Sequence, residues 1–269
     1  MHITKLKETM NDRVLNPTID QAVRNKTIDM VCQTLEQLPT PHHASRGHVA
    51  QWYDQFNQVY ESSPFYENFG GSTFNSALWL WTISQQLSPQ NIVECGTHKG
   101  FSSWLLRQAN PDAKIQTFDI IHHNLFLKLD SIDYHMMDWA EGSATCKEPT
   151  DLVFFDDHVD HSLRIIQAAE RGFQYVILDD NFSLETFHAT GVPPVPTLKM
   201  ILDSRIDELS EVQWLRNGKK KNYKIDALKI AEARSYIDQW IDIPELGIVN
   251  RRGFQSEMSF VKLKPKSTN

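Results

Sequence analysis

Two short apolar runs, each closed by a pair of aspartates, constrain the fold of this chain more than any other feature. They lie at residues 154–158 (FFDDH) and 176–181 (VILDDN). Runs of this composition are typical of strands that are buried on both faces of a parallel sheet. Carboxylates that follow such strands lie at the edge where open α/β sheets bind ligands. If the two strands are neighbours, their carboxylates could together hold a hard divalent cation such as magnesium.

From residue 91 onward the chain repeats a strand–turn–helix pattern. This pattern predicts an α/β protein with right-handed crossovers and a Rossmann-like, doubly wound, mostly parallel seven-stranded sheet. Helices are expected after the first, the fourth and the fifth strand. The predicted strands are 91–95, 114–119, 132–136, 151–156 and 174–179, and segments 212–215, 246–250 and 257–263 could complete the sheet.

Residues 1–88 are predicted to form a helical N-terminal extension, a lid or an oligomerisation surface, and residues 89–269 a separate domain. Helical spacing of apolar residues over 28–38 and an aromatic-rich stretch over 49–60 indicate two helices. A third helix should begin at Ser72 or Thr73 as N-cap and end before Pro89. Core packing explains these aromatic residues, and a roof over a substrate pocket is the alternative.

The 269-residue chain is mildly acidic, with a formal net charge of −7. This balance argues against nucleic acid or an anionic membrane as the main partner. The lysines of segment 219–224 are interpreted as a solvated turn, with a phosphate or acidic-substrate contact as the alternative. The proline-rich segment 191–196 (GVPPVP) cannot form a helix or a central strand, so it is expected to be an extended loop at a rim or lid.

The cysteines and the N-terminus indicate where such a protein would reside. Cys32, Cys95 and Cys146 are widely spaced and form no CxxC pair, so neither a disulfide framework nor a structural zinc site is expected. The first residues lack the apolar stretch of a secretion signal, and no segment approaches the length of a membrane span. These features predict a cytoplasmic protein.

A glycine-containing loop follows the strand predicted at 91–95. In residues 94–100 (ECGTHKG), Gly96 and Gly100 would allow a tight turn and a close approach to a ligand. The helix that follows offers its N-terminal amides to an anion. The pattern differs from the dinucleotide glycine motif and from the P-loop. Asp119 then ends the second strand, where an acidic residue can accept hydrogen bonds from ribose hydroxyls.

With Asp138 after the third strand, residues 91–181 resemble the core of class I S-adenosylmethionine-dependent methyltransferases. The resemblance implies that Glu94, Gly96 and Gly100 surround the methionine end of the cofactor and that Ser102 contacts its carboxylate. It further implies that Asp119 holds the ribose and that Asp138 and Trp139 lie against the adenine. Helix packing is the alternative for Trp139, and a surface helix cap is the alternative for Asp138.

The two aspartate pairs carry a narrower resemblance, to metal-dependent small-molecule O-methyltransferases. These include the catechol type, the macrolide and aminocoumarin sugar type, and cephalosporin-hydroxylase-like proteins. Asp156 matches their first metal ligand under either comparison. The sugar-type pattern then selects Asp179 and Asp180, whereas the catechol-type pattern selects Asp180 and Asn181. The resemblance therefore implies Mg²⁺ or another divalent cation on Asp156 and Asp180, with the third ligand open.

The same resemblance suggests a general base. The sugar-type enzymes place the base two residues after the first ligand, and His158 occupies that position here. Histidine is a competent proton acceptor near neutral pH. His161 lies one helical turn later and could serve instead, and both histidines could also be solvent-facing residues at a helix start.

Together these features predict a metal-dependent O-methyltransferase that acts on a small hydroxylated molecule. A bound divalent ion lowers the pKa of a hydroxyl group and fixes its position, and both effects favour methyl transfer to the oxygen. A metal-independent methyltransferase and a non-catalytic cofactor-binding or assembly protein are the alternatives, and a nicotinamide dehydrogenase is a distant third. The acceptor is not identified, and a homo-oligomer is left open.

Overall fold

The structure is a computed structural model that describes residues 17–65, 71–187, 193–216 and 218–265. Its N-terminal part is helical, as the sequence predicts, with α2 (Pro17–Gln37), α3 (Arg46–Glu61) and α4 (Phe74–Leu87). Thr73 is the N-cap of α4, because its hydroxyl accepts a hydrogen bond from the Ser76 amide. Ser88 ends this helix in the left-handed conformation.

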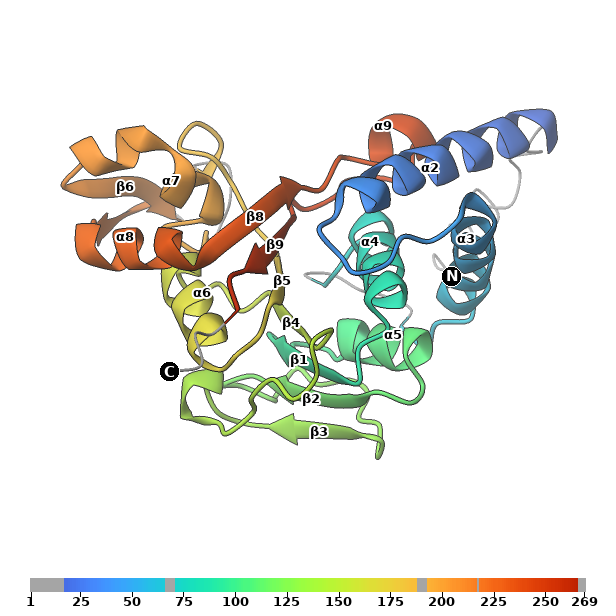
Figure 1. The fold of residues 1–269 in the computed structure, drawn as a ribbon, viewed down its shortest axis with the longest axis horizontal. Coiled ribbons are helices and arrows are strands. Elements are labelled where there is room, and N and C mark those ends of the chain that lie inside the picture. The colour runs from blue at the N-terminus through green and yellow to red at the C-terminus, as the bar shows by residue number, and fades with distance from the viewer. Residues whose placement is uncertain (1–16, 66–70, 188–192, 217, 266–269) are drawn as a thin grey trace, which may run out of the picture.

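A seven-stranded sheet forms the centre of the molecule (Figure 1). The strand order is β3-β2-β1-β4-β5-β9-β8; the first five are mutually parallel, and β9 is antiparallel to both β5 and β8. The predicted fold class, a Rossmann-like and mostly parallel seven-stranded sheet, is confirmed. The strands are β1 (Asn91–Cys95), β2 (Lys114–Phe118), β3 (Ile132–His135), β4 (Leu152–Phe155), β5 (Tyr175–Leu178), β8 (Ile237–Asp242) and β9 (Ser259–Leu263).

Helices cover both faces of the sheet, because alternate residues of each strand face opposite sides. In β4, Leu152 and Phe154 join the apolar cluster under α4 and α5 (Phe101–Ala109). Val153 and Phe155 join the cluster under α6 (His161–Glu170) and α8 (Ala227–Tyr236). Figure 1 shows these two layers on either side of the strands.

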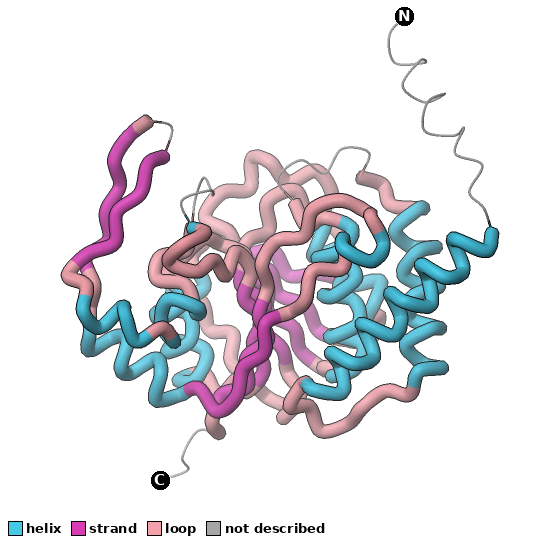
Figure 2. The backbone as a smooth tube through the Cα atoms, turned by 90° about the horizontal axis from the view of Figure 1, so that it is seen from above, coloured by secondary structure: helices cyan, strands magenta, loops and turns pink. Residues whose placement is uncertain are grey.

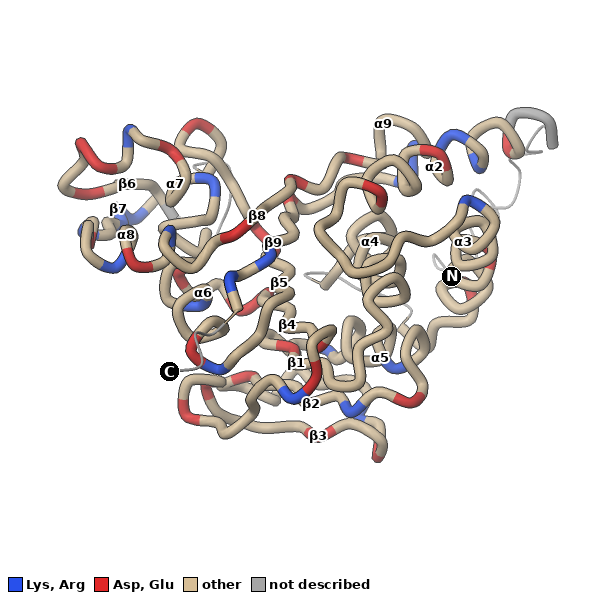
Figure 3. The backbone as a smooth tube through the Cα atoms, in the orientation of Figure 1, with Lys and Arg blue, Asp and Glu red and all other residues tan. Residues whose placement is uncertain are grey.

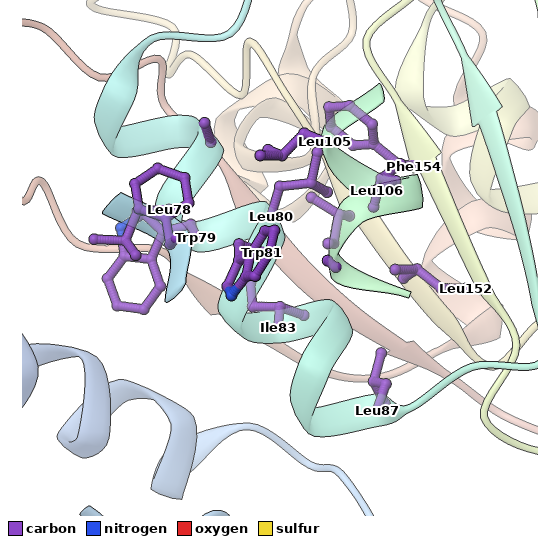
Figure 4. Close-up of a cluster of buried hydrophobic side chains, with 14 of the residues drawn as sticks. Leu78, Trp79, Leu80, Trp81, Ile83, Leu87, Leu105, Leu106, Leu152 and Phe154 are labelled. Atoms are coloured by element: carbon purple, nitrogen blue, oxygen red, sulfur yellow. The ribbon is translucent and has the colours of Figure 1, made fainter. Parts of the chain in front are cut away.

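The N-terminal helices share one apolar cluster with α5 and one face of the sheet. Figure 4 shows α4 and α5 beside the sheet, with Leu105 and Leu106 close to Phe154 and with Trp79 next to Leu78 on the far side of α4. Each such side chain, when fully buried, stabilises the fold by about 2 kcal/mol. The apolar residues of α2 and α3 belong to the same cluster. The aromatic residues of the predicted helices, Phe56 and Trp79 among them, therefore pack in the core.

Two C-terminal predictions were wrong, and one strand was missed. The segment expected as a strand at 212–215 does form a strand, β6 (Glu211–Arg216), but it pairs with β7 (Lys219–Lys224) in a separate two-stranded sheet. The segment expected as a strand at 246–250 contains a single-turn helix, α9 (Gly247–Asn250), which lies beside α2. The strand β8 was not predicted, whereas β9 lies within the predicted segment 257–263.

The lysine-rich segment is a strand rather than a turn. The backbone tube in Figure 2 shows the β6–β7 hairpin extending from the body of the molecule. Lys219, Lys220 and Lys221 are exposed along β7, and Figure 3 shows its basic residues beside β6. The interpretation of these lysines as solvated is therefore confirmed, although the local structure differs.

Between β5 and β6 the chain contains α7 (Leu198–Leu202) and a 3₁₀ turn, η3 (Ser204–Glu208). Residues 191 and 192 of the predicted proline-rich loop lie outside the described residues. Residues 193–196 form a loop, as predicted, but their side chains are buried. Across the described residues, none of the helices combines the length and the apolar character needed to cross a membrane.

Candidate functional site

The carboxyl ends of the parallel strands surround a cavity of about 590 Å³. Six of the residues predicted from the sequence line this cavity, although they come from four different loops. They are Gly96, Asp119, Asp138, Trp139, Asp156 and His158. Glu94, Gly100 and Ser102 are not among the residues that line it. The edge of the sheet that was predicted to bind a ligand therefore borders this cavity.

Both predicted glycines have backbone angles that favour glycine. Gly96 has φ = +102°, and a β-carbon there would lie 2.2 Å from the carbonyl oxygen of Asp156. Gly100 has φ = +87° and N-caps α5; a β-carbon there would lie 2.7 Å from the Leu127 carbonyl oxygen. Glycine at position 96 thus lets the end of β1 approach the acidic loop after β4.

Glu94 is fully buried in β1, next to the glycine loop. The hydroxyl of Ser103 donates a hydrogen bond to its Oε2 atom, whereas Oε1 has no hydrogen-bond partner among the described residues. Burial raises the pKa of this carboxyl, against the opposing effect of hydroxyl hydrogen bonds. Ser102 is also buried, and it borders a much smaller hollow of about 10 Å³ beside Gly96.

Asp119 follows β2 and presents its carboxylate at the cavity wall. Its Oδ2 atom accepts a hydrogen bond from the His98 amide at 2.9 Å, and Oδ1 accepts one from the Ile121 amide at 3.0 Å. Ile120, Ile121 and Met137 continue the same wall with large apolar side chains that are exposed. A rigidly held carboxylate beside an apolar wall suits a ligand that combines hydroxyl groups with a flat ring.

Asp138 follows β3 and does act as a helix cap, the alternative considered from the sequence. Its Oδ1 atom accepts a hydrogen bond from the Ala140 amide at 2.7 Å, at the start of the 3₁₀ turn η1 (Trp139–Glu141). Both carboxylate oxygens also bind Arg164, at 2.9 and 3.0 Å. Burial acts to raise the pKa of Asp138, but the hydrogen bonds from Arg164 and the Ala140 amide, together with the charge of Arg164, outweigh it and the pKa is lowered. Asp138 thus remains a charged group of the cavity wall.

Trp139 packs in the core, the alternative considered from the sequence. Its side chain is fully buried, with ring centroids 5.2 Å from Phe155 and 6.0 Å from Phe173. The Arg171 guanidinium lies over the same ring at 4.2 Å. Trp139 reaches the cavity wall, but its ring faces protein, so we do not assign it a stacking role against a ligand.

The acidic pairs after β4 and β5 come together as predicted, and a histidine joins them. Ligand atoms of Asp156, His158 and Asp180 lie within 4.8 Å of one another. The Nδ1 atom of His158 lies 3.0 Å from Oδ2 of Asp180. This hydrogen bond raises the pKa of the imidazole, against the effect of burial.

The backbone around this group is strained. His158 has φ = +56° and Asp180 has φ = +54°, both in the left-handed region that few residues other than glycine adopt. His98, in the glycine loop, has φ = +44°. Such conformations cost about 1–3 kcal/mol each and cluster at functional sites. Here three of them lie at the ligand edge of the sheet.

The electrostatics of the group favour a cation. Burial raises the pKa of Asp156 well above its ordinary value, and the neighbouring Asp179 and Asp180 raise it further. Burial, with Asp180 as the next cause, raises the pKa of Asp179 to about 7. A positive ion among these carboxylates would relieve their mutual repulsion. Two carboxylates and an imidazole also match the donors that divalent metals take in proteins, so these residues fit a metal site.

The two residues that compete for third metal ligand are placed differently. Asp179 is buried behind the group, and its Oδ1 atom accepts a hydrogen bond from the Asp180 amide at 2.9 Å. The Asn181 side chain is turned towards β9 and β8. Its amide nitrogen donates to Ser259 Oγ at 2.5 Å, and its Oδ1 atom accepts from the Lys199 amide at 2.8 Å. Asn181 therefore has a structural role, and we do not include it among the ligands proposed below.

His161, the second histidine considered as a base, is buried at the first turn of α6. Its Nδ1 atom accepts a hydrogen bond from the Leu198 amide at 3.0 Å, which ties α6 to α7. Burial lowers the pKa of this imidazole to about 4. His161 is therefore neutral and inward-facing, contrary to both roles considered from the sequence.

We expect His161 to make the fold sensitive to acid. Its pKa of about 4 in the fold is below the ordinary value of 6.5, so the unfolded chain binds the proton first. Between pH 7.5 and pH 5 this difference should lower the free energy of unfolding by about 2 kcal/mol. Urea denaturation of the wild type and of His161→Gln, at both pH values, tests it. The free energy of unfolding of the variant should lack this part of the pH dependence. An equal change between the two pH values in both proteins would contradict the lowered pKa of His161.

Two residues of the site were missed from the sequence. Arg164 lines the cavity from α6 and binds both Asp138 and Asp157. The sequence gives little sign of this role: Arg164 lies in the helix expected after the fourth strand, four residues after its N-cap Asp160. His98 also lines the cavity, and its buried Nδ1 atom has no hydrogen-bond partner among the described residues.

Comparison with known proteins gives matches among solved structures only. No family model matches the sequence, and no curated protein matches it. A structure of cmcI with Mg-SAM is 18% identical and covers 46% of this chain, with a TM-score of 0.34. This chain spans 64% of the length of that protein.

Two O-methyltransferases match over more of the chain. The enzyme from Bacillus cereus, in complex with SAH, is 13% identical over 88% of this chain and 99% of its own, with a TM-score of 0.39. TomG from Streptomyces achromogenes, in complex with SAM, is 14% identical over 87% and 96%, with a TM-score of 0.41.

Proposed function

We propose that the chain is an S-adenosylmethionine-dependent methyltransferase that methylates a hydroxyl group of a small molecule with the help of a divalent cation. One observation carries the proposal: a single cavity is lined both by Asp119 beside an apolar wall and by Asp156 and His158, which come together with Asp180. The first feature suits a nucleoside, and the second suits a cation next to a proton acceptor. Their proximity is what a methyl transfer to oxygen requires.

The cofactor would lie across the ends of β1, β2 and β3. Asp119, held by two backbone amides, would accept hydrogen bonds from the ribose hydroxyls. Ile120 and Met137 would contact the adenine ring, in place of the Trp139 contact expected from the sequence. When bound, S-adenosylmethionine supplies an electrophilic methyl group. Glu94 and Ser102, which lie deeper in the glycine-loop region, would serve the methionine end.

Asp156 and Asp180 would hold the cation through their carboxylate oxygens. The ion would lower the pKa of an acceptor hydroxyl and fix its orientation. Carboxylate ligands suit Mg²⁺ and Mn²⁺. Asp179, buried beside both ligands, would add negative charge to the site without direct contact.

His158 would take the proton from the acceptor. Its Nδ1 atom is oriented by Asp180, which leaves Nε2 as the atom that accepts the proton. The side chain is 45% exposed, so an acceptor molecule can reach it. An aspartate that orients a histidine in this way also stabilises the imidazolium formed on proton transfer. The distance of Nδ1 from the carboxylates also allows a second role for His158, as a third metal ligand.

Binding of S-adenosylhomocysteine tests the cofactor part of the proposal. Isothermal titration calorimetry should show binding to the purified protein, and Asp119→Ala should weaken it by about 10- to 100-fold, since hydrogen bonds to a charged group are lost. Asp133→Ala is the matched control, because Asp133 lies on β3 in an exposed ion pair with Lys114. It should leave the affinity unchanged. A wild-type protein that binds neither S-adenosylhomocysteine nor S-adenosylmethionine would rule the proposal out.

A further inference from the structure

Arg164 is a buried arginine at the base of the proposed site. Its side chain, on α6, is only 2% exposed. The guanidinium donates two hydrogen bonds to Asp138, from Nη1 to Oδ1 at 2.9 Å and from Nη2 to Oδ2 at 3.0 Å. Its Nη2 atom also lies 2.6 Å from Oδ2 of Asp157. One side chain therefore bridges two acidic residues that are 19 positions apart in the sequence.

The two partners of Arg164 belong to the two halves of the proposed site. Asp138 lies in the loop after β3, on the wall assigned to the cofactor. Asp157 lies between Asp156 and His158, in the loop assigned to the cation and the base. A shift of Asp157 would move both of these neighbours. The guanidinium is thus the direct link between the cofactor loop and the acidic loop.

The chemistry of the link requires arginine. The planar fork of a guanidinium can bind one carboxylate with two parallel hydrogen bonds and still reach a second carboxylate. A lysine ammonium provides the same charge from a single point and cannot hold both loops in one geometry. Asp138 and Asp157 would repel each other without this cation, and Asp157 is largely buried.

We propose that Arg164 is a positioning residue that couples cofactor binding to cation binding. The inference depends on the proposed function, since it assumes that both ligands bind in this cavity. A cofactor that orders the Asp138 loop would, through Arg164, hold Asp157 in place and favour the geometry of Asp156 and His158. Such coupling is reciprocal, so the cation raises the affinity for the cofactor by the same factor.

Calorimetric titration of S-adenosylhomocysteine, with and without MgCl₂, tests this coupling. In the wild type, Mg²⁺ should increase the affinity by about fivefold or more, the lower end of typical couplings. In Arg164→Lys each ligand should still bind alone, but the factor by which Mg²⁺ increases the affinity for S-adenosylhomocysteine should fall close to one. A residue with only a structural role would lower both affinities and the thermal stability and leave the factor unchanged.

Arg171→Lys is the matched control. Arg171 follows the same helix and donates to the carbonyls of Trp139 and Ala140, but no contact connects it to Asp157 among the described residues. Its replacement should leave the coupling factor at the wild-type value. If Arg164→Lys is not folded by circular dichroism, Asp157→Asn serves instead, because it removes one side of the bridge and keeps the Asp138 pair.

The outcomes separate this inference from the proposed function. If the wild type binds neither ligand, the proposed function fails and the inference fails with it. If both ligands bind but Mg²⁺ does not change the affinity for S-adenosylhomocysteine, only the inference fails. Retention of full coupling in Arg164→Lys, or in Asp157→Asn where that variant replaces it, would also overturn it.

Discussion

Replacement of Asp156 by asparagine is expected to weaken Mn²⁺ binding by about 100-fold or more, since even residues outside the ligand set change metal affinity by 10- to 100-fold. Turnover with a hydroxylated acceptor should fall by about 1,000-fold, because a metal ion supplies several kcal/mol of transition-state stabilisation. EDTA should reduce the wild type to a similar rate. Mn²⁺ electron paramagnetic resonance measures the binding, and release of S-adenosylhomocysteine measures the turnover.

Without metal, Asp156→Asn should be more stable than the wild type. Burial and the charges of Asp179 and Asp180 raise the pKa of Asp156, so its ionised form destabilises the fold at neutral pH. Asp156→Asn should therefore unfold at a higher temperature than the wild type in EDTA, and it should lose the stabilisation that Mn²⁺ gives the wild type. The exposed Asp133→Asn should change neither property. Full turnover of the wild type in EDTA would favour a metal-independent transferase.

The strands of the parallel half could be predicted because their signal is local. Val176, Ile177 and Leu178 form a short β-branched and apolar run that is typical of a strand buried on both faces. The antiparallel half gave no such signal. Strand β8 has mostly half-exposed or exposed residues, and it depends on pairing with β9, some 20 positions later. The exposed lysines of β7 have no apolar periodicity, and cross-strand pairing with β6 holds them in a strand.

The site was predictable to the extent that topology determines it. Asp156 and Asp180 follow adjacent parallel strands, so their proximity is a consequence of the strand order. The directions of individual side chains are not local properties. Asn181 turns towards Ser259, 78 positions away, and the inward direction of His161 depends on the packing of α7. The left-handed backbone at His158 and Asp180 likewise depends on the surrounding fold rather than on residue type.

Replacement of His158 by glutamine is expected to reduce kcat/KM by about 100- to 10,000-fold, the usual contribution of a general base. Glutamine keeps a polar side chain of similar reach but cannot accept a proton. The affinities for Mn²⁺ and S-adenosylhomocysteine should stay within about threefold of the wild type, since Asp156 and Asp180 remain as ligands. Because the Asp180 hydrogen bond raises the pKa of His158, wild-type kcat/KM should rise with pH through a midpoint above 6.5.

The His158 variant also decides between the two roles that its position allows. If His158 is the base, its replacement should leave the Mn²⁺ affinity intact and remove the pH-dependent limb of kcat/KM. If His158 is a third ligand, its replacement should weaken Mn²⁺ binding by about 100-fold and thereby lower turnover indirectly. His123→Gln is the matched control, since His123 lines the same cavity but lies outside the acidic group. It should leave turnover and Mn²⁺ affinity near wild-type values. A large loss of Mn²⁺ affinity in His158→Gln alone would contradict the assigned base and make the metal site Asp156–His158–Asp180.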